Sequence, residues 1–431
     1  MRRELPGFYF DEGKNRYFPL SSKPKAASHA SESNTPKISG EPPRNSPSEH
    51  HASAPPPRQK NAWRSLERAR SATSRRQIEQ YSHSVLHSQI ASTSACQIVP
   101  LYEQYISALG IETCDDRMVA LMGDSNGVLS RCEIPTEAYL SMSASNIPQH
   151  WARVFHLGSR ISSISMSGPI WITTSFGPDC RIFVHDRVAD RTTAHKPHST
   201  INDVWTSHLV NRSLAIGARQ RACFVPDIEH LRGLRFLETR SDVFAVHQHE
   251  ARLYTGARNG SVSRFDTRMA MHKGDALFGV APEATGNSAT FLATVGPSQL
   301  LVSTIRGNIA LFDVRYPRAT RPVLILHGHV NSFMPTLPHA VSPCQSYLFA
   351  AGLDRRVRGW SLRTGEPLRP PDASFSPRLR TAEDTRMNPF AMVFPEPVAA
   401  LQTVDIEDNI CLFAASVNEL YRFKLGQQAA D

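Results

Sequence analysis

Residues 252–268 read RLYTGARNGSVSRFDTR, and the same pattern returns as QLLVSTIRGNIALFDVR at residues 299–315 and as YLFAAGLDRRVRGWSLRTG at residues 347–365. Each stretch begins with an apolar run, passes through a turn that contains Gly, Asn or Asp, and continues with alternating apolar positions up to an aromatic residue. Two apolar runs joined by such a turn are typical of two paired β-strands. The three stretches therefore predict three copies of one two-stranded unit.

Four weaker copies extend the pattern along the chain. They are RMVALMGDSNGVLSRCEI (117–134), IWITTSFGPDCRIFVHD (170–186), SLAIGARQRACFVPD (213–227) and CLFAASVNELYRF (411–423). The residues at the position of the closing aromatic are Cys132, His185, Pro226, Phe265, Phe312, Trp360 and Phe423, at intervals of 53, 41, 39, 47, 48 and 63 residues. A period of roughly 40 to 45 residues is typical of the WD-repeat blade, in which this position is usually Trp.

Seven such units predict an all-β fold, a closed seven-bladed WD-repeat β-propeller over residues 95–426 with a short tail at 427–431. Closure is expected because each blade has an apolar face and an edge that only neighbouring blades can cover. The long last interval contains a proline-rich insertion, residues 366–397, which we expect to be a loop and a candidate for selecting a partner protein.

The N-terminal arm divides into three parts. Residues 1–20 hold five aromatic residues (Phe8, Tyr9, Phe10, Tyr17 and Phe18), a density that predicts a docking motif. Residues 21–60 contain eight Pro and nine Ser, so they predict a largely disordered linker.

Residues 61–94 form the third part, a basic segment that favours a helix. Its apolar residues Ile78, Tyr81 and Val85 have helical spacing. The alternative is a solvated segment that orders only when bound. Whether the basic residues 58–76 form a nuclear-localisation signal or a partner-binding helix stays open.

The charge of the chain is concentrated in this arm. The full sequence has a formal net charge of +9, and residues 1–80 carry 15 Lys and Arg against 8 Asp and Glu, whereas the other 351 residues carry 33 against 31. A nearly neutral propeller argues against nucleic acid as its partner. A chromatin or RNA partner bound by the basic segment is the third hypothesis.

Without a long apolar run or a secretory leader, we expect no membrane contact and a nuclear or cytoplasmic location. We expect the seven cysteines, an odd number, to be reduced core residues.

No local catalytic signature occurs in the sequence: the phosphate-binding loop, dinucleotide, zincin and hydrolase-elbow patterns are all absent. We therefore predict no enzyme, no catalytic residue, no cofactor and no metal. His327 and His329 precede a predicted first strand, where a histidine that hydrogen-bonds within its blade is typical. Asp354 lies in a strand–strand turn, where its carboxylate can accept hydrogen bonds from backbone and histidine donors.

Two consecutive blades end in the same pattern, Phe265-Asp266-Thr267-Arg268 and Phe312-Asp313-Val314-Arg315. An Arg two residues after an Asp at the end of a strand lies beside a carboxylate that can orient its guanidinium. Two adjacent copies predict two oriented arginines on one rim, which suits a protein interface. Ordinary surface pairs are the alternative.

This double Asp-x-Arg pattern resembles the WDxR motif of the substrate receptors of cullin-4 ubiquitin ligases. Among these, the cullin-4-associated factor 4-like WD-repeat proteins are similar to the chain over residues 4–18 and about 241–363, through LPGFYFDEGKNRYF, SDVFAVHQHEARLYTGARNGSVSRFDTR, GNIALFDVRYPRATRPVLILHGHVNSF and FAAGLDRRVRGWSL. The chain departs from the motif in having Phe265 and Phe312 where tryptophan is usual.

The resemblance implies a non-catalytic receptor that docks on DNA-damage-binding protein 1, the adaptor of the ligase, and presents an unknown protein substrate. Asp266, Arg268, Asp313 and Arg315 would bind the adaptor, while Phe265, Phe312, His329, Asp354 and Trp360 would hold the blades together. The alternative function is a general WD-repeat scaffold in a complex unrelated to ubiquitin.

Overall fold

The structure is a computed structural model of the 431-residue chain. It describes residues 8–11, 16–19, 76–101, 105–114, 117–135, 151–229, 233–269, 273–278, 287–316, 321–370, 388–407 and 409–427. The chain divides into two compact units, residues 1–69 and 70–431. In the first unit, β1 (Phe8–Asp11) and β2 (Arg16–Pro19) pair as an antiparallel hairpin. The predicted disordered linker 21–60, residues 61–75 of the basic segment and residues 428–431 of the tail lie outside the described residues.

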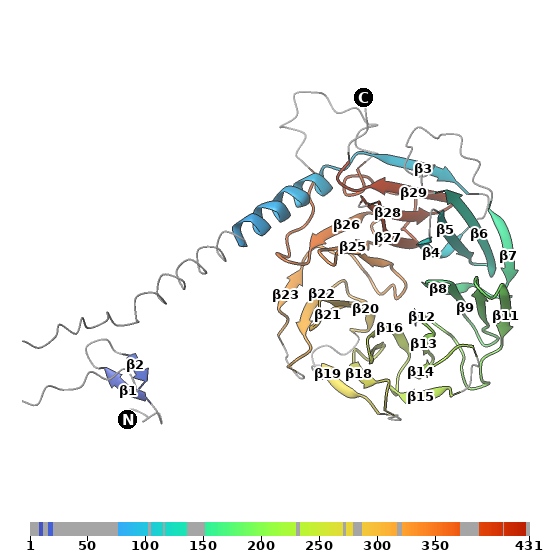
Figure 1. Ribbon diagram of the computed structural model, residues 1–431, viewed down its shortest axis with the longest axis horizontal. Helices are drawn as coiled ribbons and strands as arrows, with labels where there is room; N and C mark the ends of the chain where they lie inside the picture. Colours follow the sequence, from blue (N-terminus) through green and yellow to red (C-terminus); the bar gives the residue numbers. More distant parts are fainter. Residues whose placement is uncertain are drawn as a thin grey trace, which may run out of the picture. The chain divides into compact units, whose positions relative to one another are not determined.

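The second unit is a ring of seven antiparallel sheets, as the repeats predict (Figure 1). Blade 1 consists of β4 (Ile106–Cys114), β5 (Arg117–Asp124), β6 (Val128–Pro135) and β7 (Ala152–His156). Blade 2 consists of β8 (Ile161–Ser167), β9 (Ile170–Ser175), β10 (Ile182–Asp186) and β11 (Arg191–His195). Blade 3 consists of β12 (Thr206–Val210), β13 (Ser213–Ala218), β14 (Arg221–Val225) and β15 (Arg235–Glu238). Blades 4 and 5 are β16 (Val243–His249), β17 (Arg252–Ala257), β18 (Val262–Asp266) and β19 (Asp275–Phe278); β20 (Ala289–Val295), β21 (Gln299–Thr304), β22 (Ile309–Asp313) and β23 (Leu324–Leu326). Blade 6 has β24 (His339–Val341), β25 (Tyr347–Ala351) and β26 (Val357–Ser361), and blade 7 has β27 (Ala400–Ile406), β28 (Asn409–Ser416), β29 (Glu419–Lys424) and β3 (Cys96–Pro100). The expectation of a seven-bladed β-propeller is thus confirmed.

The apolar runs of the repeats become the second strand of each blade, which is buried on both faces. In β9 and β25 every residue is buried. Among the described residues, the buried apolar side chains form seven clusters, and each cluster joins two neighbouring blades, blade 7 and blade 1 included. Cys132, Cys180, Cys223 and Cys411 belong to these clusters as small apolar side chains. The core therefore lies between the blades and depends on the ring being closed.

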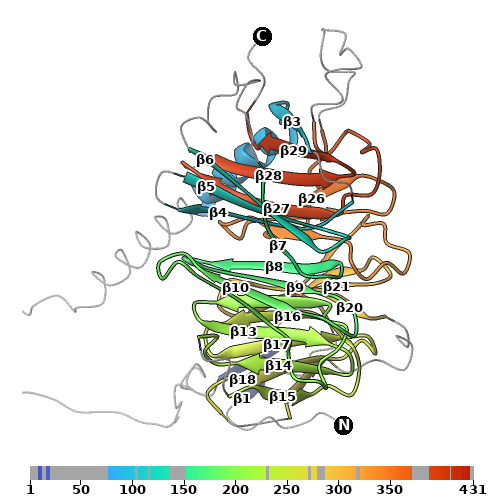
Figure 2. The same ribbon diagram turned by 90° about the vertical axis from the view of Figure 1, so that its right-hand side faces the viewer.

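The closing strand comes from the N-terminal side of the propeller. β3 pairs antiparallel with β29, with Cys96 opposite Phe423 and Pro100 opposite Glu419. Blade 7 is therefore built from both ends of the propeller sequence. The strands of all the blades run across the thickness of the ring, so the strand ends form two opposite faces (Figure 2).

Strand register corrects one position of the repeat. Phe265 pairs with Leu253 and Phe423 with Leu412. The equivalent partner of Leu214 in blade 3 is Val225, not the predicted Pro226, which follows the strand. The sequence alignment was off by one residue because the equivalent position holds Val225, and the aromatic residue of this strand, Phe224, stands one position before it.

The insertion 366–397 is not a removable surface loop at either end. Its first residues complete blade 6: Pro367 bridges to Trp360, and the N–H of Leu368 donates to the carbonyl of Gly359 (2.8 Å). At its other end, Phe394 is 1% exposed and packs on Tyr421 and Phe423 in the cluster between blades 6 and 7. Deleting the whole insertion would open this interface, so only residues 371–387, outside the described part, are left as a candidate for partner selection.

Replacing Phe394 by Ala should destabilise the propeller by about 3 to 5 kcal/mol, since a buried phenyl ring is lost and a cavity remains. The matched control is Val393→Ala, because Val393 is the preceding residue and is 45% exposed. Urea unfolding of the full chain measures both. Equal midpoints for the two variants would contradict the assignment of residues 388–398 to the core.

Candidate functional site

The two Asp-x-Arg sequences form the same turn at the ends of β18 and β22, on the face where the third strands end. The backbone N–H of Arg268 donates to Asp266 Oδ1 (3.0 Å), its Nε–H donates to the same oxygen (3.0 Å), and its Nη2 donates to Oδ2 (2.7 Å). Arg315 repeats all three bonds on Asp313 at 3.0, 3.0 and 2.6 Å. Each carboxylate thus holds both the turn and the guanidinium plane.

These pairs leave most of each guanidinium open to solvent. The Arg268 and Arg315 side chains are 76% and 66% exposed. A guanidinium has five N–H donors, and the paired Asp occupies two of them, so three still point outward. The hydrogen bond from Arg268 lowers the pKa of Asp266 to about 2, and the bond from Arg315 lowers the pKa of Asp313. Both carboxylates therefore stay ionised and keep the arginines oriented at physiological pH.

The aromatic residues before these turns are packed between blades. Phe265 is 3% exposed, and its ring lies so close to Gly274 that an added Cβ there would be 2.7 Å from its Cζ atom. Phe312 packs against the cluster between blades 4 and 5. Phe in place of Trp at these two positions is therefore accommodated in the core, below the exposed arginines.

In blade 6, the three predicted structural residues have different partners. The Trp360 indole donates to the carbonyl of His327 (2.9 Å), and His329 donates from Nε2 to the carbonyl of Ala351 (3.0 Å). Asp354 does not accept from a histidine as expected: its carboxylate is held by Nη1 and Nη2 of Arg358 (2.9 and 2.6 Å). The sequence could not indicate this, because Arg358 is one of several arginines around the turn.

Blade 6 also carries a third version of the turn that the sequence comparison missed. Trp360-Ser361-Leu362-Arg363 follows β26 as Phe265-Asp266-Thr267-Arg268 follows β18, with Ser361 in place of Asp. Ser361 Oγ accepts from the N–H of Arg363 (3.2 Å) and contacts His83 Nε2 (2.8 Å). Because Ser361 has no charge to pair with Arg363, this turn instead anchors the helix.

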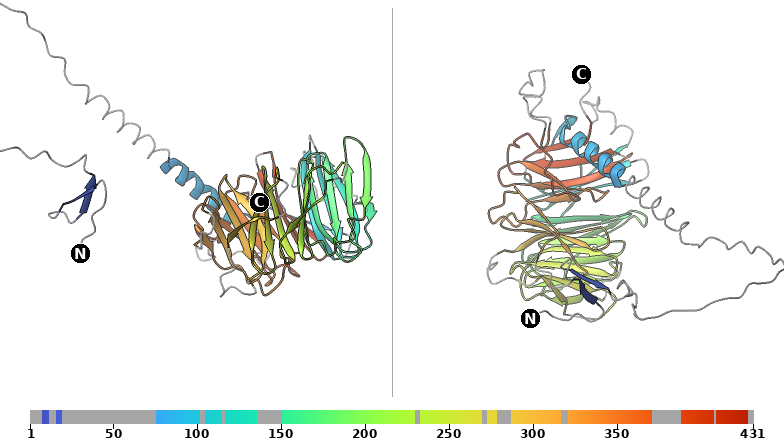
Figure 3. Two further views of the ribbon diagram at one scale, coloured as in Figure 1. Left: turned by 90° about the horizontal axis from the view of Figure 1, so that it is seen from below. Right: turned by 90° about the vertical axis from the view of Figure 1, so that its left-hand side faces the viewer.

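Residues 76–91 form the helix that contains His83, and it projects from the ring beside blade 6 (Figure 3). His83 stacks on Tyr347 (5.5 Å between ring centroids), and Ile90 is buried in the cluster between blades 6 and 7. The apolar stripe noticed in the sequence faces outward instead: Ile78 is 64% exposed and Tyr81 73%.

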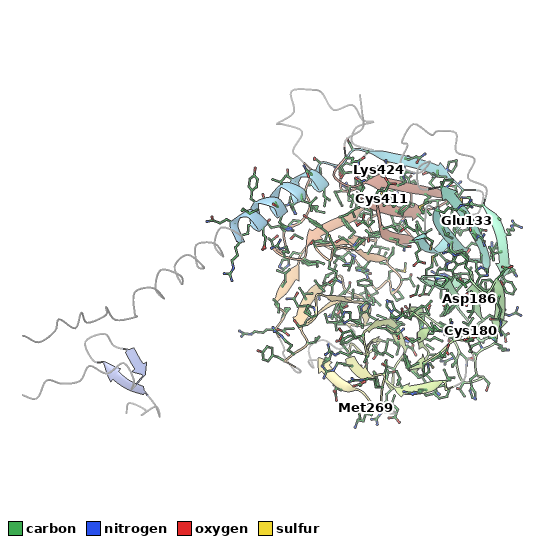
Figure 4. The ribbon with its side chains drawn as sticks, viewed as in Figure 1. Glu133, Cys180, Asp186, Met269, Cys411 and Lys424 are labelled. Carbon is green, nitrogen blue, oxygen red and sulfur yellow. The ribbon has the colours of Figure 1, made fainter. Side chains whose placement is uncertain are left out.

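Other large apolar side chains lie next to the Asp-x-Arg turns. Met269 directly follows Arg268 and lies at the outer edge of the ring, where its side chain is 51% exposed (Figure 4). Tyr316 directly follows Arg315, and the Arg315 guanidinium lies 5.9 Å from the centre of the Tyr316 ring. Exposed apolar side chains beside oriented cations are typical of protein interfaces.

Two histidines that line the channel at the centre of the ring are neutral: His339 is buried and His208 is half-buried. His339 donates from Nδ1 to the carbonyl of Leu337 (3.0 Å), and burial lowers its pKa to about 3. His208 accepts at Nδ1 from the N–H of Gln248 (3.2 Å), and burial lowers its pKa to about 4. Among the described residues, no group of three or more His, Cys, Asp or Glu side chains could hold a metal ion.

Comparisons with known proteins support the β-propeller fold. No protein-family model matches it. An uncharacterized WD repeat-containing protein of Caenorhabditis elegans, F47D12.9, is 31% identical over 117 residues, 27% of this chain and 20% of that protein. The chain therefore matches only about a fifth of the length of this relative.

Two solved structures are similar to the chain to different degrees. The WD40 β-propeller domain of Doa1 matches with a TM-score of 0.54 and 13% identity, covering 77% of this chain and 96% of the domain. The computationally designed protein Ika8 matches with a TM-score of 0.47 and 13% identity, covering 75% of this chain and 97% of the design. The first of these likenesses supports the WD-repeat propeller and carries no further information on function. In the part of the chain that the structure describes, no helix is long and apolar enough to cross a bilayer.

The buried histidines predict a loss of stability in mild acid. Their pKa is lower in the folded chain than the unfolded value of about 6.5, so below pH 6.5 the unfolded chain binds protons that the folded chain does not. Their contribution is complete above pH 6.5 and falls as the pH drops toward 4, by up to about 1.4 kcal/mol per pH unit for each histidine. Urea unfolding between pH 4.5 and 7.5 measures this slope. His339→Asn should make it shallower, and an unchanged slope would contradict the neutral, buried state of His339.

Proposed function

We propose that this chain is a non-catalytic substrate receptor of a cullin-4 RING ubiquitin ligase that docks on DNA-damage-binding protein 1 through Arg268 and Arg315. The observation that carries the proposal is the repeated turn: two exposed guanidiniums, each fixed by its own carboxylate, leave the same face of adjacent blades. The resemblance of both turns to the WDxR motif of the cullin-4 receptors supports this identification of the partner.

The pairing within each turn suits docking for an energetic reason. An exposed ion pair contributes little to folding, so the two arginine side chains are not needed for stability. A guanidinium already held in one plane loses less side-chain entropy on binding, and its three outward N–H groups match carboxylate or carbonyl oxygens of a partner. We infer that the adaptor supplies such acceptors opposite both turns.

The helix beside blade 6 extends this surface. His83 attaches the helix to the third turn, on the same face as Arg268 and Arg315. Ile78 and Tyr81 of this helix are exposed, and we propose that the adaptor covers them when it binds the two arginines. Burial of these side chains would add affinity that the charged contacts alone do not supply.

One experiment distinguishes a cullin-4 ligase receptor from a general WD-repeat scaffold. Affinity purification of the tagged full chain at native salt, followed by mass spectrometry, should recover DNA-damage-binding protein 1 and a cullin. A different stoichiometric complex, with neither protein present, would favour a WD-repeat scaffold unrelated to ubiquitin.

The arginines give the first prediction for this complex. Arg268→Ala with Arg315→Ala should weaken adaptor binding about thirtyfold or more, because buried acceptors of the adaptor would be left unpaired. Arg→Lys at both positions should not restore binding, since an ammonium cannot reproduce the planar fork. Surface plasmon resonance with purified adaptor measures the affinity.

The control is Arg240→Ala, which removes an arginine 84% exposed, outside the two turns. All variants should keep their melting temperature to within about 2 °C, because they change exposed side chains only. Full adaptor affinity in the double variant, with an unchanged melting temperature, would refute the docking role of the two turns.

The helix gives a second prediction. Ile78→Ala with Tyr81→Ala should weaken adaptor binding about tenfold through lost apolar burial. Gln80→Ala, an exposed change on the same helix, should have no effect. If the Ile78→Ala, Tyr81→Ala variant binds the adaptor as well as Gln80→Ala does, the helix lies outside the interface, and only the Asp-x-Arg turns would form the docking site.

A further inference from the structure

A cavity of about 320 Å³ opens at the mouth of the central channel, on the face opposite to the Asp-x-Arg turns. It is surrounded by the residues that begin the innermost strands, whereas the Asp-x-Arg turns follow the third strands, and in antiparallel blades these two sets of ends lie on opposite faces. The volume is at the lower end of the range of ligand pockets, roughly 300 to 1,000 Å³.

The sheet is built to turn side chains into this cavity. In four blades, one residue near the start of the first strand has no partner in the pairing with the second strand, which makes a β-bulge. The four strands are β4, β8, β16 and β20, and the unpaired residues are Ser107, Ser162, Phe244 and Thr290. All four skipped residues line the cavity. A β-bulge re-aims a side chain and is over-represented next to functional sites, so its recurrence in four blades marks this mouth as a shaped site.

Three aromatic side chains form one wall. Trp205 lies 4.7 Å from Phe176 and 4.8 Å from Phe244, measured between ring centroids, and it meets Phe244 edge to face at 74°. All three are partly exposed. Their exposed faces therefore offer an apolar, aromatic surface to a ligand in the cavity.

Arg160 supplies the charge of the site. Among the described residues that line the cavity, Arg160 is the charged one, and none is a carboxylate. The Arg160 side chain is exposed. Ser107 and Ser162 already donate their hydroxyls to backbone carbonyls (2.7 and 3.2 Å). The cavity therefore offers the Arg160 guanidinium and an aromatic wall, which select an anionic group next to an apolar one.

We infer that this cavity binds a segment of a partner protein in which an acidic residue stands next to an aromatic residue. The aromatic side chain packs edge to face among Phe176, Trp205 and Phe244, and the carboxylate binds Arg160. The inference does not depend on the proposed ligase role, because the adaptor would occupy the opposite face.

A peptide array tests the inference with the full chain. The probes are ten-residue peptides whose two central positions pair Asp, Glu, Lys or Ser with Phe, Leu or Gly, flanked by Gly and Ser. Peptides with Asp-Phe or Glu-Phe should bind best, with affinities measured by fluorescence anisotropy. Arg160→Glu should weaken their binding tenfold or more and shift the preference to Lys-Phe, while Phe244→Ala should weaken every Phe-containing peptide.

The matched control is Arg306→Glu, which reverses the charge of another exposed arginine at a turn on the same face but outside the cavity lining. It should keep the wild-type ranking. Because Arg160 is exposed, Arg160→Glu should fold normally, which its melting temperature checks. No preference for acidic-aromatic peptides, or the wild-type ranking retained in Arg160→Glu, would overturn the inference.

Discussion

The pairing of β3 with β29 is the interaction on which the rest of the propeller depends. All seven apolar clusters lie between blades, so an open ring would expose the cluster of blade 7 with blade 1 and leave an unpaired edge on β29. The junction is reinforced below the strands, where Gly426 donates to Thr93 Oγ1 (2.9 Å) and Ser94 to the carbonyl of Gln427 (3.1 Å). The same chain segment leads directly into the helix, so closing the ring also fixes the helix beside blade 6.

Closure divides the molecule into two faces with different chemistry. One face carries arginines that are already paired with carboxylates, Arg268 and Arg315, and the turn at Ser361 that holds the helix. Such exposed ion pairs change the free energy of folding little, and their arginine side chains lose little entropy when a partner binds. On the other face, the described residues that line the cavity include Arg160 and a partly exposed aromatic wall but no carboxylate, which favours a small anionic and apolar motif. A receptor that holds an adaptor and a substrate together needs two such separate surfaces.

The repeat pattern predicted the fold well because blade burial imposes it on the sequence. The second strands are largely buried and therefore mostly apolar, and the turns need Gly, Asn or Asp. Seven units could therefore be found even with Trp360 as the only tryptophan at its position. The Asp-x-Arg turns are local in sequence, and their internal hydrogen bonds follow from that. Features that depend on contacts through space were not predictable: the partner of Asp354, the outward direction of Ile78 and Tyr81, and the packing of Phe394. The bulges around the channel were equally hidden, since a skipped residue looks like any other strand residue until the register with its neighbour is known.

The central claim is that the face with the Asp-x-Arg turns is the adaptor surface and that the channel mouth stays open in the complex. Hydrogen–deuterium exchange of the full chain with and without DNA-damage-binding protein 1 tests this most directly. The account predicts slower exchange at residues 266–269, 313–316 and 361–365 and along the helix 76–91, with no change around Arg160, Trp205 and Phe244. Protection at the channel mouth with unchanged exchange at the three turns would contradict it.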